Sequence, residues 1–261
     1  MSMVFAAEGE GFTPPGLADF WQPYVGDGAF AITRPMTLMV FSTVLIVAGL
    51  LVVTRKLSVV PGKSQMATEG LYDVVRNSIA RDIIGSRDFL RFVPLLFAMF
   101  MLILVNNLFG VIPFIQYPTM ARIGFPIAIT LVVYVVYLFI GMKRQGVWGY
   151  IKGLIPPGLP TWIIPLFFFL ELLTFFVTRP VTLALRLFGN MFAGDLLLLL
   201  MTLGGEYMLL HGGPVLKVMS VGPFAMNLVL TVFELLVEFL QAYIFTLLAA
   251  LYIAGSLADE H

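Results

Sequence analysis

The chain has 261 residues, of which 60% are hydrophobic and 11% charged, and its formal net charge is zero. Soluble domains carry about 25% charged residues, so this composition excludes a water-soluble fold and indicates a polytopic membrane protein. Zero net charge gives no basic surface for nucleic acid, and the lack of cysteine excludes disulfides and thiolate chemistry. Two histidines, His211 and His261, are too few for a haem or metal cluster, so we expect no metal and no cofactor.

The first half of the chain predicts an extracytoplasmic arm followed by three upright helices. No lysine or arginine precedes Arg34, so a cleaved signal peptide with its basic start is excluded, and residues 1–36 form the predicted arm. Three charge-free runs follow, each long enough to cross a hydrocarbon core about 30 Å thick as one helix. They are Thr37–Thr54, Phe92–Ile115 and Ile123–Met142.

Basic residues set the expected orientation. They concentrate after the first run, from Arg55 to Arg91, and after the third, at Lys143, Arg144 and Lys152. The positive-inside rule then places the N-terminus outside and both basic segments in the cytoplasm. Within residues 61–91 the stretch 68–89 alternates apolar and charged residues with a helical period, which predicts an amphipathic helix at the cytoplasmic interface.

The second half contains apolar runs too long for single upright helices. Thr161–Gly205 and Val218–Ala258 would each extend roughly 60–68 Å as a helix, about twice the bilayer core. Pro180 predicts a kink in the first run and Gly222–Pro223 an interruption near the start of the second. We expect Glu206–Lys217 to form a turn between them.

The predicted fold class is therefore all-α and integral to the membrane. About three upright transmembrane helices occupy residues 37–152, together with the amphipathic interfacial segment. Residues 153–261 form a C-terminal hairpin of two long, strongly tilted membrane helices, where the ionisable residues of the membrane core concentrate. We expect this hairpin to hold the functional site.

Arg186 is the most informative of those residues, since a guanidinium stays charged at any accessible pH. An arginine at bilayer depth costs roughly 2.5–3.5 kcal/mol on translocon scales, so its charge is expected to serve a purpose. On a helix Asn190 shares a face with Arg186, and Arg179 lies seven residues earlier on the same side. Asp195 lies about 180° away, and the small residues after Arg186 allow another helix to approach closely: Gly189, Ala193 and Gly194.

On the second long run Glu234, Glu238 and Gln241 follow an i, i+4, i+7 stripe. A carboxylate in low-dielectric surroundings can hold and release a proton near neutral pH, and two such acids, for example Asp195 and Glu234, tend to share one. Acids beside a cation that cannot titrate would form a proton route with a barrier in it.

Less functional interpretations compete with this one. Arg186 could be a structural arginine paired with Glu171 or Asp195, and Arg179 is expected to snorkel to the interface. Glu238 could face a cytoplasmic water pocket without any relay role. We interpret Asn106 and Asn107 as residues that form hydrogen bonds between helices.

Four pieces of the chain carry a recognisable pattern. They are Val60-Pro61-Gly62-Lys63, Asn107-Leu108-Phe109-Gly110-Val111-Ile112-Pro113, Arg179-Pro180-Val181-Thr182-Leu183-Ala184-Leu185-Arg186-Leu187-Phe188-Gly189-Asn190-Met191-Phe192-Ala193-Gly194, and Leu240-Gln241-Ala242-Tyr243-Ile244-Phe245-Thr246-Leu247-Leu248. In this order they resemble the a subunit of the F-type ATP synthase membrane sector. The likeness extends over nearly the whole chain from about Thr33, and the arginine block is its most specific part.

The resemblance implies a role for each polar residue of the hairpin. Arg186 matches the arginine that separates two aqueous half-channels and faces the rotating ring of c subunits. Asn190 matches its neighbour one turn on, and Gln241 the glutamine that lies against it from the last helix. The implied proton-relay positions are Glu171, Asp195, Glu234 and Glu238.

The chain also departs from the pattern of the family. Asp195 stands where Glu or His is common, and the relay pair Asp195 and Glu234 consists of two carboxylates where some members pair His with an acid. Glu171 sits one residue further from the Arg179–Pro180 pair than in several members.

These observations predict the stationary half of a rotary proton motor. The chain has no nucleotide site, so it is not an enzyme by itself, and ATP chemistry belongs to the catalytic sector. The resemblance implies as partners the c-subunit ring, the peripheral-stalk b subunits and the lipid of a bacterial plasma membrane. Two alternatives stay open: a stand-alone proton-coupled secondary transporter, and a purely structural membrane anchor that would tolerate loss of Arg186.

Overall fold

The computed structural model describes residues 23–25, 32–55, 57–112, 117, 119–153, 160 and 162–257. Most of the predicted N-terminal arm lies outside the described residues. So do the last four residues of the chain, including His261, and the end of the predicted second span, residues 113–115.

The described chain is helical apart from a short antiparallel pairing of β1 (Pro23–Val25) with β2 (Ile32–Thr33). Within it, five helical runs are long and apolar enough to cross a membrane, which confirms the predicted all-helical membrane fold. The first three are α1 (Arg34–Arg55), α4 (Phe89–Val111) and α5 (Gly124–Lys152). The other two are built from α6 (Ile164–Leu173), η4 (Thr174–Thr178) and α7 (Arg179–His211), and from α8 (Pro214–Met219) and α9 (Val221–Leu257).

The predicted amphipathic segment is also helical. It comprises α2 (Lys63–Asp73), η2 (Val74–Arg81) and α3 (Asp82–Ile84). Val75 and Ile79 are fully buried on η2 and join the main core, whereas most of α2 is exposed. The segment ends at Gly85, whose φ of 92° is a left-handed conformation that favours glycine. Its position at a membrane interface stays a prediction.

The third long helix continues ten residues past the predicted end at Met142 and bends on the way. Gly146 adopts a φ of 74°, so the chain turns there. The turn carries the ring of Tyr150 onto Gly141, where a β-carbon would collide with it. The end of α5 is thus fixed by ring packing that hydropathy does not reveal.

Two local predictions for the second half are wrong. Glu206–Lys217 is not a turn: α7 runs on to His211, the break falls at Gly212–Gly213, and α8 follows. Gly222–Pro223 does not interrupt α9 but lies in its first turn, where the missing proline N–H costs no hydrogen bond. The irregularity near Pro180 takes the form of η4, a π-helical turn that ends one residue before Arg179.

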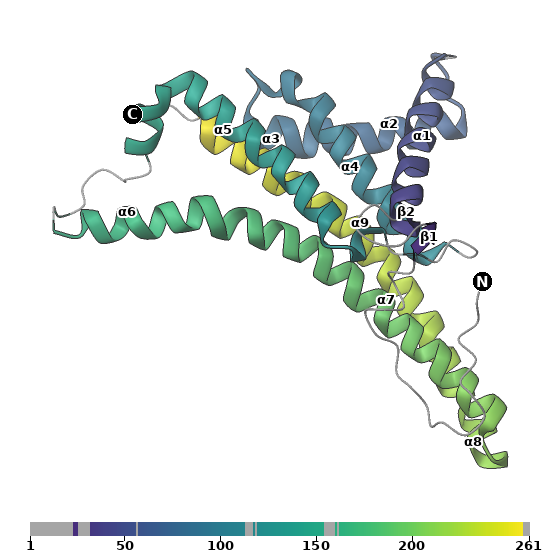
Figure 1. Ribbon diagram of the computed structural model, residues 1–261. Helices are drawn as coiled ribbons and strands as arrows, with labels where there is room; N and C mark the ends of the chain where they lie inside the picture. The colour runs from purple at the N-terminus through teal and green to yellow at the C-terminus, as the bar shows by residue number, and fades with distance from the viewer. Residues whose placement is uncertain are drawn as a thin grey trace.

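The core forms where α9 crosses α4 and α5 and packs along α7 (Figure 1). Its largest fully buried side chains come from several of these helices and include Phe100, Tyr137, Leu187 and Phe245. From there α7 and α9 run side by side to α8, and they form the expected antiparallel hairpin (Figure 1). The tilt of this hairpin against a bilayer stays a prediction.

Candidate functional site

Arg186 lies exposed on the surface of α7. Among the described residues its guanidinium has no ion pair and no hydrogen bond. The structural alternative, a pair with Glu171 or Asp195, is therefore not formed: Glu171 contacts Arg179 instead, at 3.3 Å between Oε1 and Nη2. A fixed positive charge thus stands on the helix surface, and exposed apolar side chains such as Val181 and Leu185 flank it.

Asn190 connects this surface to α9. Its side-chain Nδ2 donates a hydrogen bond to Oε1 of Gln241 at 2.7 Å. Gln241 is buried, and its Nε2 has no acceptor in the described part of the chain. The two amides predicted beside Arg186 are therefore brought together, across the α7–α9 interface and one helical turn from the guanidinium.

Three carboxylates gather on the other side of that contact. Asp195 on α7 and Glu234 and Glu238 on α9 are 7%, 7% and 3% exposed, and we call them the acid cluster. Oδ2 of Asp195 and both oxygens of each glutamate have no hydrogen-bond donor among the described residues. A buried carboxylate without a donor is stable when it carries a proton or when water reaches it, so these groups are suited to proton exchange.

Two glycines leave the space that the acid cluster occupies. A β-carbon on Gly110 of α4 would lie 2.8 Å from Oδ1 of Asp195 and 3.4 Å from Oε1 of Glu238. A β-carbon on Gly194 would collide with the carboxylate of Glu234. Both contacts involve carboxylate atoms, so these glycines shape the site as well as the helix packing.

The roles of these glycines are only partly predictable from the sequence. The sequence indicates Gly194 only as a small residue for close helix approach, and Gly110 only as part of a piece that resembles the family. Gly189, expected to serve the same packing purpose as Gly194, has open space where a β-carbon would stand, with nothing within 4 Å. The neighbouring Asn107 is the available signal for Gly110, because a glycine three residues from a buried amide shares its helix face.

The predicted hydrogen bonds of Asn106 and Asn107 between helices are confirmed. Asn107 is 2% exposed and donates from Nδ2 to the backbone carbonyl of Glu238 at 3.4 Å, so α4 contacts α9 at the acid cluster. Asn106 donates to Oγ of Ser42 at 2.9 Å and accepts from Oγ1 of Thr119 at 3.0 Å. Asn106 thus holds α1 to α4, and Asn107 contacts α9 at the acid cluster.

Glu171 lies away from the acid cluster. It is 24 residues before Asp195 on one helical run, which corresponds to roughly 36 Å along the axis. Arg186 lies between the two positions. The predicted relay residues therefore fall into two groups, one on each side of the unpaired arginine.

Arg179 is held by several neighbouring side chains, and its expected position at the membrane interface stays a prediction. Besides its contact with Glu171, its guanidinium lies 4.9 Å from the ring centroid of Phe175 and 5.7 Å from that of Tyr252 on α9. About a third of its side chain is exposed. Arg179 is therefore held by its neighbours, whereas Arg186, seven residues on, is not.

Among the residues described, no group of three or more histidine, cysteine, aspartate or glutamate side chains is arranged to hold a metal ion. What the site offers is a set of buried acids and amides on α4, α7 and α9, together with Arg186, which is exposed on α7 and has no partner among the described residues. Fold and site together define a multi-pass helical membrane protein with ionisable groups inside its helix bundle.

Comparison with known proteins identifies the family. The family model described as ATP synthase A chain matches residues 36–254. A protein named ATP synthase subunit a from a Nocardioides species is 43% identical over 100% of this chain and 98% of its own length. Proteins of the same name from Pseudarthrobacter chlorophenolicus and Streptomyces lividans are 40% and 37% identical, over 100% and 97% of this chain and 100% and 91% of their own lengths. The chain belongs to the ATP synthase A chain family.

Proposed function

We propose that this chain is the stationary, proton-conducting subunit of the ATP synthase membrane sector. In this role it passes protons through two half-channels to and from carboxylates on a ring of c subunits. The observation that carries the proposal is Arg186, exposed on α7 without a partner among the described residues, together with the buried acid cluster on α7 and α9. Family membership supports proton transport in ATP synthesis and assembly with other subunits.

The acid cluster forms the extracytoplasmic half-channel in this proposal. The positive-inside rule puts the basic segment at Lys143 and Arg144 in the cytoplasm, so the end of α7 and the start of α9 face outward. Asp195 lies about 14 Å further along α7 than Arg186, on that outward side. Protons would pass among the three carboxylates, whose packing around Gly110 and Gly194 supports direct exchange.

Arg186 separates the two half-channels and meets the rotor. An unpaired guanidinium on a lipid-depth surface is costly unless an anion faces it. In Figure 1 no described element lies on the outer, lower-left side of the α6–η4–α7 run, and exposed apolar side chains cover this run. A ring bearing membrane carboxylates fits both features: its apolar surface packs on the run, and each acid in turn faces the arginine.

Asn190 and Gln241 position the surface around Arg186. Their hydrogen bond holds α7 against α9 one turn from the arginine, and the free Nε2 of Gln241 supplies a further donor there. Glu171 falls on the cytoplasmic side of Arg186 in the proposed orientation, so we do not assign it to the half-channel of the acid cluster.

The remaining assignments follow the same proposal. ATP is made by the catalytic sector and not by this chain, while peripheral-stalk b subunits hold the chain against the turning ring. The location is a bacterial plasma membrane with the start of α1 outside. Residues 37–152 scaffold the hairpin at 153–261, which contains the proton path. The sequence match to the ATP synthase A chain family argues against the stand-alone transporter.

Replacing Glu234 with glutamine tests the half-channel. ATP-driven acidification of membrane vesicles should slow on the order of ten-fold, because the amide cannot take up and release a proton. The matched control is Glu206→Gln, an exposed acid on the same hairpin, which should pump at the normal rate. An unchanged rate in Glu234→Gln, with the complex assembled, would remove Glu234 from the proton path.

A further inference from the structure

The α6–α7 run changes its hydrogen-bond register just before its two arginines. Residues Thr174–Thr178 form the π-turn η4, and the N–H of Arg179 bonds back to the carbonyl of Thr174, five residues earlier. A π-turn takes about one residue more than an α-turn because its bonds run from i to i+5. Such turns inside long helices often occur at functional sites.

This extra residue brings Glu171 and Arg179 onto one face of the helix. The two residues are eight apart, and in a regular α-helix they would be rotated by about 80° from each other. One α-turn plus one π-turn contains about eight residues, so the two side chains face the same way. They form the ion pair of 3.3 Å, with 25% of the glutamate and 33% of the arginine side chain exposed.

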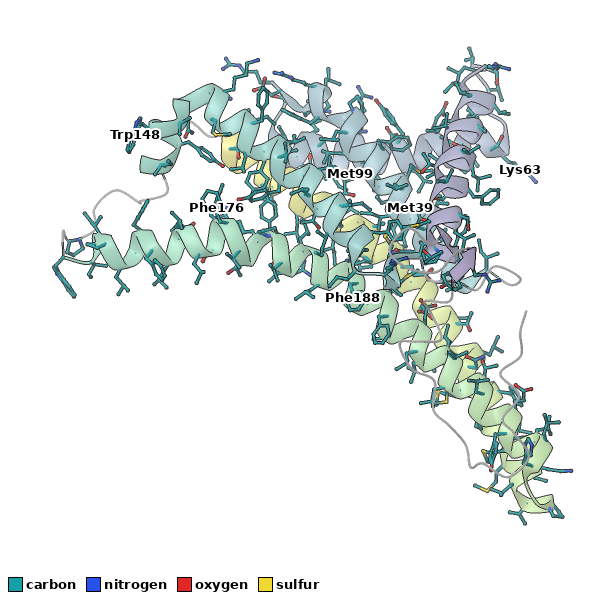
Figure 2. All side chains as sticks on the ribbon, viewed as in Figure 1. Met39, Lys63, Met99, Trp148, Phe176 and Phe188 are labelled. Atoms are coloured by element: carbon teal, nitrogen blue, oxygen red, sulfur yellow. The ribbon has the colours of Figure 1, made fainter. Side chains whose placement is uncertain are left out.

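Arg179 links this ion pair to two other helices. Its guanidinium lies over the rings of Phe175 and Tyr252. The ring of Tyr252 in turn contacts Tyr137 of α5 at 5.7 Å between centroids, with the two rings tilted by 51°. Phe175 is buried and meets Tyr137 edge-on at 5.4 Å. Phe176 points from η4 toward α5, where it contacts Tyr134 (Figure 2). The rotation of the long helix at Arg179 is therefore fixed against both α5 and α9.

We propose that η4 and the Glu171–Arg179 ion pair form a positioning clamp that sets the rotation of α7, so that Arg186 points at the rotor. Arg186 lies seven residues beyond Arg179, about two turns and close to the same face. Any rotation of α7 at Arg179 would therefore turn Arg186 as well. The proposal rests on the proposed function, and it makes Glu171 a positioning residue and not a carrier of protons.

The test separates the position of the acid from the register of the helix. The double change Glu171→Leu with Leu172→Glu moves the carboxylate by one residue at constant composition. Deletion of Val177, which is 48% exposed within η4, converts the π-turn to an α-turn and leaves Glu171 seven residues from Arg179. Four chains are compared: glutamate at position 171 or at position 172, each with and without Val177. Each chain is assembled into the whole ATP synthase.

Two readouts are taken from each variant: ATP-driven proton pumping by vesicles and the rotation of α7. The chain has no cysteine. In an otherwise cysteine-free complex, spin labels on Val181→Cys and Leu251→Cys, which are 46% and 45% exposed, therefore report the relative placement of α7 and α9. Neither position belongs to the proposed proton path, but Val181 lies on the run proposed to face the rotor, so pumping is measured on the variants without cysteine or label.

We expect the carboxylate at 172 in the full-length chain to shift the label distance and lower pumping about ten-fold, since displacement of a reacting group by about 1 Å can cost about 10²-fold. The deletion that retains Glu171 should restore both readouts to within about two-fold of the parent, because seven residues span two α-turns. Moving the carboxylate to position 172 within the deletion should again shift the label distance and lower pumping.

Three results would overturn parts of this proposal. Lost pumping with an unchanged label distance would overturn the clamp, because Glu171 would then act on protons directly. Failure of the deletion to pump or to keep the label distance, with the complex assembled, would overturn the register argument. A shifted label distance with full pumping would instead contradict the proposed function, since the orientation of Arg186 would not matter.

Discussion

Among single residues, the two arginines of α7 have different environments. Arg179 contacts a carboxylate and two aromatic rings, whereas Arg186 has no partner among the described residues. The sequence alone predicts that a charge at membrane depth is functional, but it does not tell which arginine is already neutralised. That distinction depends on the side chains from α6 and α9 that surround each one.

The acid cluster is predictable in part. The spacing of Glu234 and Glu238 in the sequence is enough to place both on one face of a helix. Whether Asp195 joins them depends on how α7 packs on α9. Glu171 is also expected from the sequence in the same proton path, whereas the helical run places Glu171 far from the acid cluster. The spacing of residues in the sequence indicates the helix face on which each residue lies, but it does not indicate which other helix packs against that face.

Gly110→Ala tests whether the space around the acid cluster matters. The new methyl group would lie 2.8 Å from Oδ1 of Asp195, so the carboxylate has to move. We expect ATP-driven pumping by assembled complexes to fall on the order of ten-fold, because proton transfer depends closely on distance. The control is Gly49→Ala in α1, where the methyl group meets nothing within 4 Å, and its pumping should be unchanged. Normal pumping in Gly110→Ala would argue that the carboxylates need no fixed spacing.

Among the elements, apolar runs, the first three of them free of charged residues, locate the five long helices, because twenty or so apolar residues with internal hydrogen bonds are the simplest way to cross a bilayer. The same runs conceal η4, the bend at Gly146 and the extension of α7 to His211. These features depend on hydrogen-bond register and on ring packing, to which hydropathy is insensitive. A kink is expected at Pro180, whereas the structure has a π-helical turn, η4, that ends just before Arg179.

Asn106→Leu tests how the first helix is held. Asn106 bonds to Ser42 of α1 and to Thr119, so the change leaves both hydroxyls without that partner. We expect the free energy of unfolding of the purified chain in mixed detergent micelles to fall by about 1 kcal/mol. Thr54→Val, an exposed hydroxyl bonded only within its own helix, serves as the control and should leave the value unchanged. Equal stability of both variants would mean that α1 is held by packing alone.

In the molecule as a whole, one bundle of helices supports one long curved surface. The bundle of η2, α4, α5 and the second half of α9 contains most of the core, while the α6–η4–α7 run forms an outer edge (Figure 1). Arg186 is exposed on α7 of that run, and the acid cluster is buried where α4, α7 and α9 meet. This arrangement suits a subunit that offers one surface to a moving partner and keeps its proton path inside its own helices.

Arg186 has two roles in the proposed motor, as the contact for the rotor and as the barrier between the half-channels. Both are tested by ATP-driven acidification of vesicles carrying Arg186→Ala, with the passive proton leak recorded in parallel. Arg55→Ala, an exposed arginine at the end of α1, is the control. We predict that the assembled Arg186→Ala complex loses pumping and leaks protons faster, while the control behaves as the parent. Retained pumping with an unchanged leak would contradict both roles and make Arg186 dispensable to the motor.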